Sequence, residues 1–340
     1  MADIRERLAQ GEKIPFDVAR TPQDGMAEAY FSLATLLVGQ PNDTLTLLNA
    51  RIAAALRPDH VEAVLMSARL FDKLGQYDLA QSTFAQVPQG DPAYVSAIIG
   101  QASSAQMAGK AQEAAALLKG LAGKNPDNAG VLSAYGDSLR RLDRCDAAIG
   151  VYSQAIALIK TAVPADWALF YRRGGCRQAQ GDWPRAEADY KLALSLAPGE
   201  PRILNELGYS YVDRGENLPQ ALAMIQQAVA AAPDEGYIID SLAWAYFRLG
   251  RYRDAVEPME RASLLEPVDP IVTDHLGEDA GHDFLVWQEF RMSGRPVLML
   301  MGGTPGVGKS TLTRLLIDKL GGRGVFEVVE ENPFLASFYT

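Results

Sequence analysis

Cysteine and histidine are scarce in this chain of 340 residues. The two cysteines are Cys145 and Cys176, and the three histidines are His60, His275 and His282. Their spacing matches neither a zinc site nor a disulfide framework. We therefore expect no metal centre or disulfide framework from these residues, and ordinary packing or surface roles for the histidines.

The chain also lacks an excess of basic residues and any long apolar run. Its formal net charge is −10, and affinity for a nucleic acid comes mostly from Lys and Arg that neutralise phosphates. No apolar stretch is long enough to span a bilayer, and no secretory signal pattern follows Met1. These absences predict a cytoplasmic protein with neither a nucleic-acid nor a membrane partner.

What the chain does contain is an internal period of about 34 residues. In three units a glycine is followed by an aromatic residue two positions later and by an alanine five positions later, as in Gly75, Tyr77 and Ala80. A fixed period of this length indicates helix pairs that bury their apolar faces by stacking on their neighbours. The prolines that mark the period are Pro58, Pro92, Pro126, Pro198, Pro233 and Pro267.

This pattern resembles the tetratricopeptide repeat over residues 27–277, as about seven repeats and a half repeat. The resemblance implies an all-α fold, a right-handed superhelical solenoid of helix pairs. A small residue on the first helix of a pair lets the second helix approach, and an alanine on the second helix packs against it. The small residues are Gly136, Gly174, Gly208 and Ala243, and the alanines are Ala80, Ala114, Ala148, Ala186, Ala221 and Ala255. The units are expected to start near Ala27, Val61, Val95, Ala129, Trp167, Pro201 and Gly236.

In such arrays the first helix of each pair lines the concave groove, so the resemblance implies that its outward residues bind a peptide or a partner protein. Exposed aromatic side chains beside Asn and Asp suit an extended peptide, because its backbone needs hydrogen bonds and its side chains need apolar pockets. The alternative is that Tyr209 and Trp244 are partly buried between adjacent repeats. The predicted groove residues are Arg140, Tyr171, Asn205, Tyr209, Asp240, Trp244 and Phe247.

The repeat pattern is weaker at both ends. Residues 1–26 give no clear repeat and are interpreted as a helical or irregular segment, and Pro41 stands where the first unit should have its glycine. An eighth unit begins at Pro270, but the pattern stops after Gly277. We interpret residues 278–295 as a linker or a cap with one or two amphipathic helical turns. Its apolar residues are Phe284, Leu285, Trp287 and Phe290.

Near the end, residues 303–310 fit the phosphate-binding pattern G-x-x-x-x-G-K-[ST]. Backbone N–H groups of such a loop surround a nucleotide phosphate, Lys309 would reach the β and γ oxygens, and Ser310 would bind Mg²⁺. An apolar run precedes the loop and leucines at helical spacing follow it, so we expect a strand, a loop and a helix N-terminus in that order. A glycine-rich turn without a ligand is the alternative. The residues predicted to hold Mg-ATP are Gly303, Thr304, Gly306, Val307, Gly308, Lys309, Ser310 and Thr311.

The segment that follows resembles the deoxynucleoside kinases, over about residues 295–340. Residues 327–335 read Glu-Val-Val-Glu-Glu-Asn-Pro-Phe-Leu, and Phe338 and Tyr339 come soon after. In that family the residue matching Glu327 accepts the proton of the nucleoside 5′-hydroxyl, so the resemblance implies a catalytic base at Glu327. Val328 departs from the proline of the family. A solvated carboxylate at a strand end is the alternative for Glu327.

The family's acidic-Arg-Ser motif and its arginine-rich lid would lie beyond Thr340. We therefore expect residues 296–340 to form an incomplete α/β P-loop segment that does not catalyse by itself, and we interpret the chain as two unrelated pieces joined by a gene fusion or a frameshift. Three functions remain open. We favour a protein-interaction scaffold that carries an inactive nucleotide-binding segment. The alternatives are an ATP-dependent deoxynucleoside kinase completed by sequence outside this chain, and an adaptor that senses a nucleotide.

Overall fold

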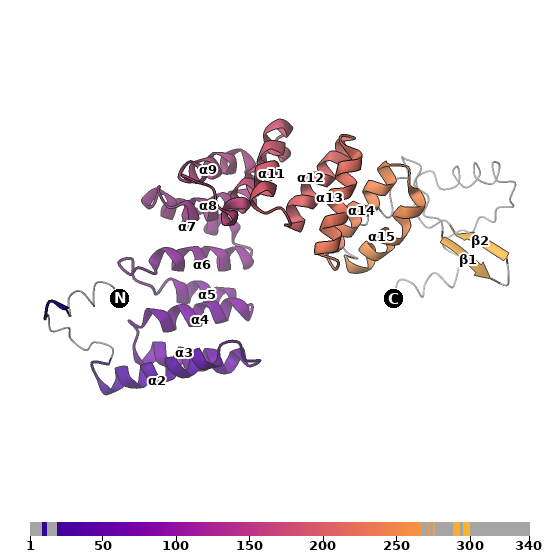
Figure 1. Cartoon of the computed structure of the whole chain (residues 1–340). Coiled ribbons are helices and arrows are strands. Elements are labelled where there is room, and N and C mark those ends of the chain that lie inside the picture. Colours follow the sequence, from indigo (N-terminus) through magenta and orange to yellow (C-terminus); the bar gives the residue numbers. More distant parts are fainter. Residues whose placement is uncertain are drawn as a thin grey trace. The chain divides into compact units, whose positions relative to one another are not determined.

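The computed structural model describes residues 9–11, 19–266, 271, 275, 288–292 and 295–299. The chain divides into two compact units, residues 1–196 and 197–340, and in each of them helices follow one another as antiparallel pairs (Figure 1). The sequence predicts one array over 27–277, and the division falls inside it. The predicted phosphate loop and Glu327 lie outside the described residues.

The described part of the first unit holds five consecutive helix pairs and one short 3₁₀ helix. The pairs are α2 (Pro22–Leu37) with α3 (Asp43–Leu56), α4 (Val61–Lys73) with α5 (Tyr77–Phe84), α6 (Tyr94–Met107) with α7 (Ala111–Lys124), α8 (Ala129–Arg140) with α9 (Cys145–Ala157), and α10 (Trp167–Ala179) with α11 (Trp183–Leu196). The 3₁₀ helix η1 (Pro164–Asp166) lies in the connection between α9 and α10.

The described part of the second unit holds two further pairs and a β-hairpin. The pairs are α12 (Pro201–Arg214) with α13 (Leu218–Ala231), and α14 (Gly236–Arg248) with α15 (Tyr252–Leu265). The hairpin strands are β1 (Gln288–Met292) and β2 (Arg295–Met299), which pair antiparallel with Gln288 opposite Met299 and Met292 opposite Arg295.

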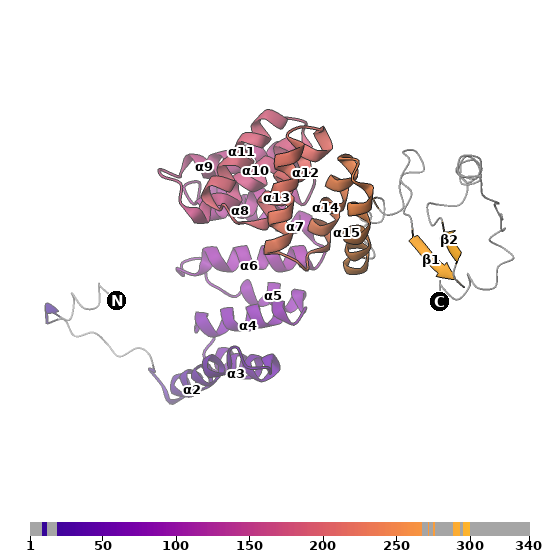
Figure 2. The same ribbon diagram turned by 45° about the vertical axis from the view of Figure 1, so that its right-hand side comes forward.

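Each unit is built by stacking neighbours. Within a unit every helix packs on the next helix along the chain, and the first helices of adjacent pairs also contact one another. These additional contacts join α4 to α6, α6 to α8 and α8 to α10 in the first unit, and α12 to α14 in the second. The helices of a unit therefore stack in chain order, as the solenoid prediction requires (Figure 2).

A left-handed residue ends the first helix of most pairs. At the end of α4, Gly75 has φ +72°, its N–H donates to the carbonyl of Asp72 at 3.0 Å, and the next N–H donates to the carbonyl of Phe71 at 2.8 Å. Glycine adopts this conformation without steric cost and so satisfies the last carbonyls of the helix. Gly109, Gly181, Gly215 and Gly250 have the same sign of φ, and in the α8–α9 pair Asp143 takes this place with φ +56°.

The small residues and alanines that the repeat pattern selects lie in the core, which confirms this part of the prediction. All six alanines are fully buried. A Cβ added to Gly136 would lie 2.5 Å from the ring of Tyr152, and one added to Gly174 would lie 2.9 Å from the ring of Tyr190. The backbones of the two helices therefore approach where the side chain is missing, and a buried aromatic ring fills that position.

Six of the seven predicted unit starts agree with helix starts to within one residue. The first unit differs, because α2 begins at Pro22 and not near Ala27. The side chain of Thr21 accepts the N–H of Asp24, and Pro22 occupies the first helical position, where its missing N–H has no cost. Thr21 and Pro22 therefore start a helix inside the segment that was expected to be helical or irregular.

The β-hairpin departs from the sequence prediction in two ways. Residues 288–292 form β1, so the helical turns predicted to include Phe290 are wrong for this part of the segment. The strand β2 lies in the apolar run that was predicted to form a strand before the loop, but it pairs with an antiparallel neighbour. Since the sheet of a P-loop domain pairs its first strand with parallel strands, the hairpin gives no support to the predicted α/β segment.

A buried ion-pair network joins α10 to α11. The carboxylate of Asp189, which is only 4% exposed, contacts Arg173 at 2.7 and 2.9 Å and Arg177 at 2.7 Å. Arg173 also donates to the hydroxyl of Ser153 at 3.1 Å. Because the two arginines are four residues apart, they lie on one face of α10 and can share one carboxylate.

Within the described residues, no helix combines the length and the apolar character needed to cross a membrane.

Candidate functional site

The predicted groove residues fall in both units. Arg140 lies in the last turn of α8 near Tyr152 and Asp137. Tyr171 lies in α10, where its ring is 5.7 Å from that of Trp167 and 5.9 Å from that of Tyr190. The other five residues belong to α12 and α14 of the second unit. These are the first helices of its two pairs, and they pack against each other.

The five residues of the second unit are less exposed than predicted. Asn205 is 6% exposed and Asp240 is 3% exposed, so the expectation that these polar residues face outward is wrong. Tyr209, Trp244 and Phe247 are half-buried, which matches the alternative of partial burial between adjacent repeats. The reason is that the first helices of neighbouring pairs contact each other, so residues at their shared boundary lose exposure.

The side chains of this surface converge on His275. Its Nδ1 lies 2.7 Å from Oδ2 of Asp240. Its ring stacks on that of Trp244, with centroids 4.5 Å apart and planes 5° apart, and it lies 6.4 Å from the ring of Tyr209. The ring of Phe247 stacks on Trp244 at 5.2 Å. We call Tyr209, Asp240, Trp244, Phe247 and His275 the aromatic cluster.

Two polar atoms at this surface have no hydrogen-bond partner among the described residues, Oδ1 of Asn205 and Nε1 of Trp244. Buried polar groups are normally paired, and leaving one unpaired costs about 1–3 kcal/mol. Asn205 lies one helical turn before Tyr209 on α12, so both occupy the same face. Burial, and then the carboxylates of Asp213, Asp240 and Glu206, raise the pKa of Tyr209 to about 12, so its hydroxyl remains a hydrogen-bond donor at neutral pH.

Sequence reasoning missed two members of this neighbourhood. Arg248 lies with its guanidinium 5.7 Å from the centre of the Trp244 ring and donates to the carbonyl of Asp213 at 3.0 Å. Helical spacing was the available signal, because Arg248 follows Trp244 by four residues. His275 belongs to the first helix of the predicted eighth unit. Because the first helices of adjacent repeats pack on each other, its contact with α14 could have been predicted.

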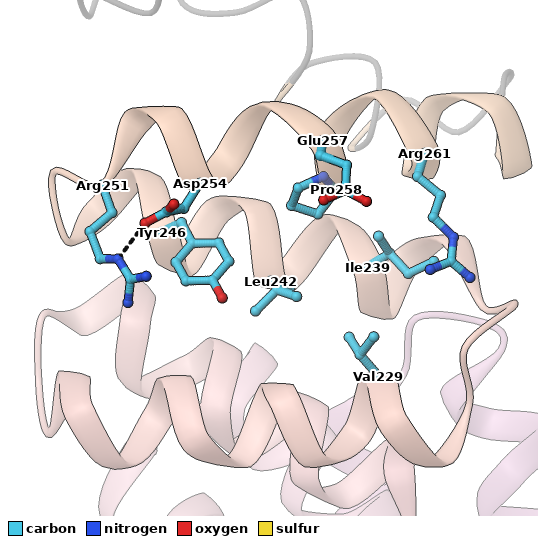
Figure 3. Close-up of a pocket in the computed structure, with 9 residues that line it drawn as sticks. All are labelled: Val229, Ile239, Leu242, Tyr246, Arg251, Asp254, Glu257, Pro258 and Arg261. Atoms are coloured by element: carbon cyan, nitrogen blue, oxygen red, sulfur yellow. Dashed lines mark hydrogen bonds and ion pairs between the residues drawn. The ribbon is translucent and has the colours of Figure 1, made fainter.

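A separate hollow lies over α13, α14 and α15 of the second unit, with a volume of about 260 Å³ (Figure 3). At one end Arg251 donates to Asp254 at 2.7 Å and covers the ring of Tyr246 at 4.6 Å. At the other end Arg261 donates to the carbonyl of Pro233. Both arginines already have partners within the fold, so we attribute the hollow to packing between the helices. One of its residues serves below as a control for the peptide-binding variants.

Sequence profiles described as tetratricopeptide repeat match residues 62–92, 99–166 and 205–264. These ranges fall on the pairs α4–α5, α6–α7, α8–α9, α12–α13 and α14–α15, and leave out α2–α3 and α10–α11. Over these ranges the chain matches the tetratricopeptide repeat. Repeats of this kind support a protein-interaction scaffold at the level of the family.

Two characterised sequences are similar to parts of the chain. The TPR repeat-containing protein PA4667 of Pseudomonas aeruginosa is 28% identical over 199 residues, which cover 58% of this chain and 33% of that protein. The deoxyadenosine/deoxycytidine kinase of Bacillus subtilis is 48% identical over 42 residues, which cover 12% of this chain and 19% of the kinase. The chain thus spans about one third and one fifth of the length of these two relatives.

Solved structures share the fold. A tetratricopeptide repeat protein from Parabacteroides merdae superposes with a TM-score of 0.60 at 12% identity, covering 74% of this chain and 98% of that one. The APC/C hetero-tetramer Cut9–Hcn1 superposes with a TM-score of 0.52 at 16% identity, covering 74% of this chain and 50% of that one. At these identities the likeness establishes the fold alone.

Proposed function

We propose that the chain is a protein-interaction scaffold that binds an extended peptide on the first helices of the second unit. The aromatic cluster supports this proposal, because several flat side chains lie together on adjacent helices and remain partly exposed. Aromatic residues of this kind are the usual anchors of a protein interface. The family-level role of tetratricopeptide repeats supports the same conclusion.

The unpaired polar atoms support an extended peptide as the ligand. Oδ1 of Asn205 can accept a backbone N–H, and Nε1 of Trp244 can donate to a backbone carbonyl. Both atoms are buried in the fold, so these side chains would have to turn outward to meet the peptide backbone. The chain carries a net charge of −10, so peptides with basic residues would be attracted fastest.

Selection of peptides from a random displayed library against the full-length chain tests this proposal. We expect Asn205→Ala and Trp244→Ala each to raise the Kd of the selected peptides about tenfold, which corresponds to about 1.4 kcal/mol, measured by fluorescence anisotropy. Tyr246→Ala is the matched control, since Tyr246 lies on the same helix as Trp244 but lines the hollow of Figure 3. Its Kd should stay within about twofold of the wild type. Equal binding by all four proteins, or no enrichment of peptides, would contradict the proposal.

A second candidate function is nucleotide binding by residues 303–311, favoured by the 48% identity over 42 residues to the Bacillus subtilis kinase. Lys309 and Ser310 would then contact the phosphates and Mg²⁺, as the sequence pattern implies. We expect wild-type protein to bind labelled Mg-ATP in equilibrium dialysis and Lys309→Ala to bind at least about tenfold more weakly. Lys319→Ala, outside the loop pattern, is the control.

The same samples separate an adaptor from an enzyme. We expect no transfer of phosphate from ATP to a deoxynucleoside, with Glu327→Gln as the reference for background. Transfer that Glu327→Gln abolishes would favour the kinase instead. Equal and negligible ATP binding by wild type and Lys309→Ala would remove both nucleotide functions and leave the scaffold.

A further inference from the structure

The two cysteines, 31 positions apart in the sequence, meet in the first unit. Cys145 is the first residue of α9 and Cys176 lies in α10, so they belong to adjacent repeats. Their sulfur atoms are 2.6 Å apart. An S–S bond is about 2.05 Å long, so the sulfurs are already closer than an ordinary non-bonded contact. The sequence spacing gave no indication of this pairing, because the repeat fold brings the two residues together.

The two thiols differ in their access to solvent. Cys176 is fully buried in the core that also contains Tyr152 and Leu139. Burial, and then the neighbouring Cys145 thiol, raise the pKa of Cys176 to about 12, so at neutral pH it is a protonated thiol that an external reagent does not reach. Cys145 is partly exposed at the start of its helix. One thiol is therefore reachable from solvent, and the other is held against it.

We propose that Cys145 and Cys176 form a reversible intramolecular disulfide by exchange with a low-molecular-weight disulfide of the glutathione type. In the first step the Cys145 thiolate attacks one sulfur of the external disulfide, forms a mixed disulfide and releases one thiolate. In the second step the Cys176 thiol loses its proton, its sulfur attacks Sγ of Cys145, and the second external thiolate leaves. The two cysteines lose two electrons, and the external disulfide gains them and the two protons to become two thiols.

The bond would join the second helix of one repeat to the first helix of the next. The segment that it closes includes η1 and the connection between α9 and α10, residues 158–166. Closing a segment of this length restricts the unfolded chain and stabilises the folded one. The disulfide therefore acts as a covalent lock between two adjacent repeats.

Mass spectrometry of the full chain after incubation with oxidised glutathione tests the proposal. We expect the wild type to lose the mass of two hydrogens and to carry no glutathione. Cys176→Ser should accumulate one glutathione on Cys145, because the resolving thiol is missing. Cys145→Ser should stay unmodified while folded, because Cys176 is buried. In denaturant, the Cys176 thiol of this last variant should react with oxidised glutathione, which would show that the thiol is intact.

Thermal unfolding gives a second readout. Oxidised wild type should unfold at a temperature several degrees above that of reduced wild type. Adding a reductant should not change the unfolding temperature of Cys145→Ser. A stable glutathione adduct on the wild type, disulfide-linked dimers, or two thiols that remain free in excess oxidised glutathione would each overturn the proposal.

Discussion

Replacing Asp189 with alanine should lower the free energy of unfolding of the first unit by about 3–5 kcal/mol. The change removes the carboxylate that both Arg173 and Arg177 contact at 2.7 Å. The side chains of these arginines are only 13% and 16% exposed, so water cannot replace the lost partner without a rearrangement of the α10–α11 pair. Two buried positive charges would then face each other with no compensation.

Urea unfolding followed by circular dichroism measures this effect. Lys191→Ala on the same helix is the matched control, because Lys191 is exposed and its contact with Glu187 is a surface ion pair worth at most about 1 kcal/mol. In an Arg173→Leu/Arg177→Leu background, Asp189→Leu should cost far less than Asp189→Ala does in the wild type. A loss below about 1 kcal/mol for Asp189→Ala would show that the network does not hold the two helices together.

Replacing Gly136 with alanine should destabilise the first unit by about 2–3 kcal/mol, although alanine is the better helix former. The new Cβ would lie 2.5 Å from the ring of Tyr152. That ring is fully buried, and its hydroxyl donates to Asp137 at 2.7 Å, so it cannot move aside without losing packing and a hydrogen bond. Helices α8 and α9 would have to separate at the point of closest approach.

Thermal unfolding checks this prediction with two further variants. Gly150→Ala, in the middle of α9 with no atom within 4 Å of the new Cβ, should stabilise the unit by about 0.5–1 kcal/mol. Adding Tyr152→Leu to Gly136→Ala should restore part of the loss, because it reproduces the Ala102 and Leu118 combination of the preceding repeat. If Gly136→Ala behaves like Gly150→Ala, the close approach of the two helices is not a constraint.

The positions that could be predicted are those whose role is fixed inside one repeat. Ala148 must be small because it is fully buried in the core, and Gly75 must adopt a positive φ because the first helix ends there. Such requirements recur in every unit and leave a periodic trace in the sequence. Thr21 and Pro22 also mark a helix start, but they lie in residues 1–26, where no clear repeat guides the prediction.

The burial of Asn205 and Asp240 could not be predicted in the same way. It depends on how the first helix of one repeat packs on the next, and that contact differs from unit to unit. The Cys145–Cys176 contact also joins two repeats, so no spacing within one unit reveals it. The β-hairpin follows the last recognisable repeat, where no periodic pattern constrains the prediction.

The neighbour-by-neighbour packing has a consequence for cooperativity. Within each unit, the substantial contacts between described helices join a helix to the next one or to the one after it. Contacts are therefore local in sequence, which favours rapid folding, and folding can start in any repeat and spread to its neighbours. A repeat weakened by mutation can open while more distant repeats in the same unit stay folded. The chain then behaves like a row of coupled segments, and proteolysis should release fragments whose ends fall in the turns between helices.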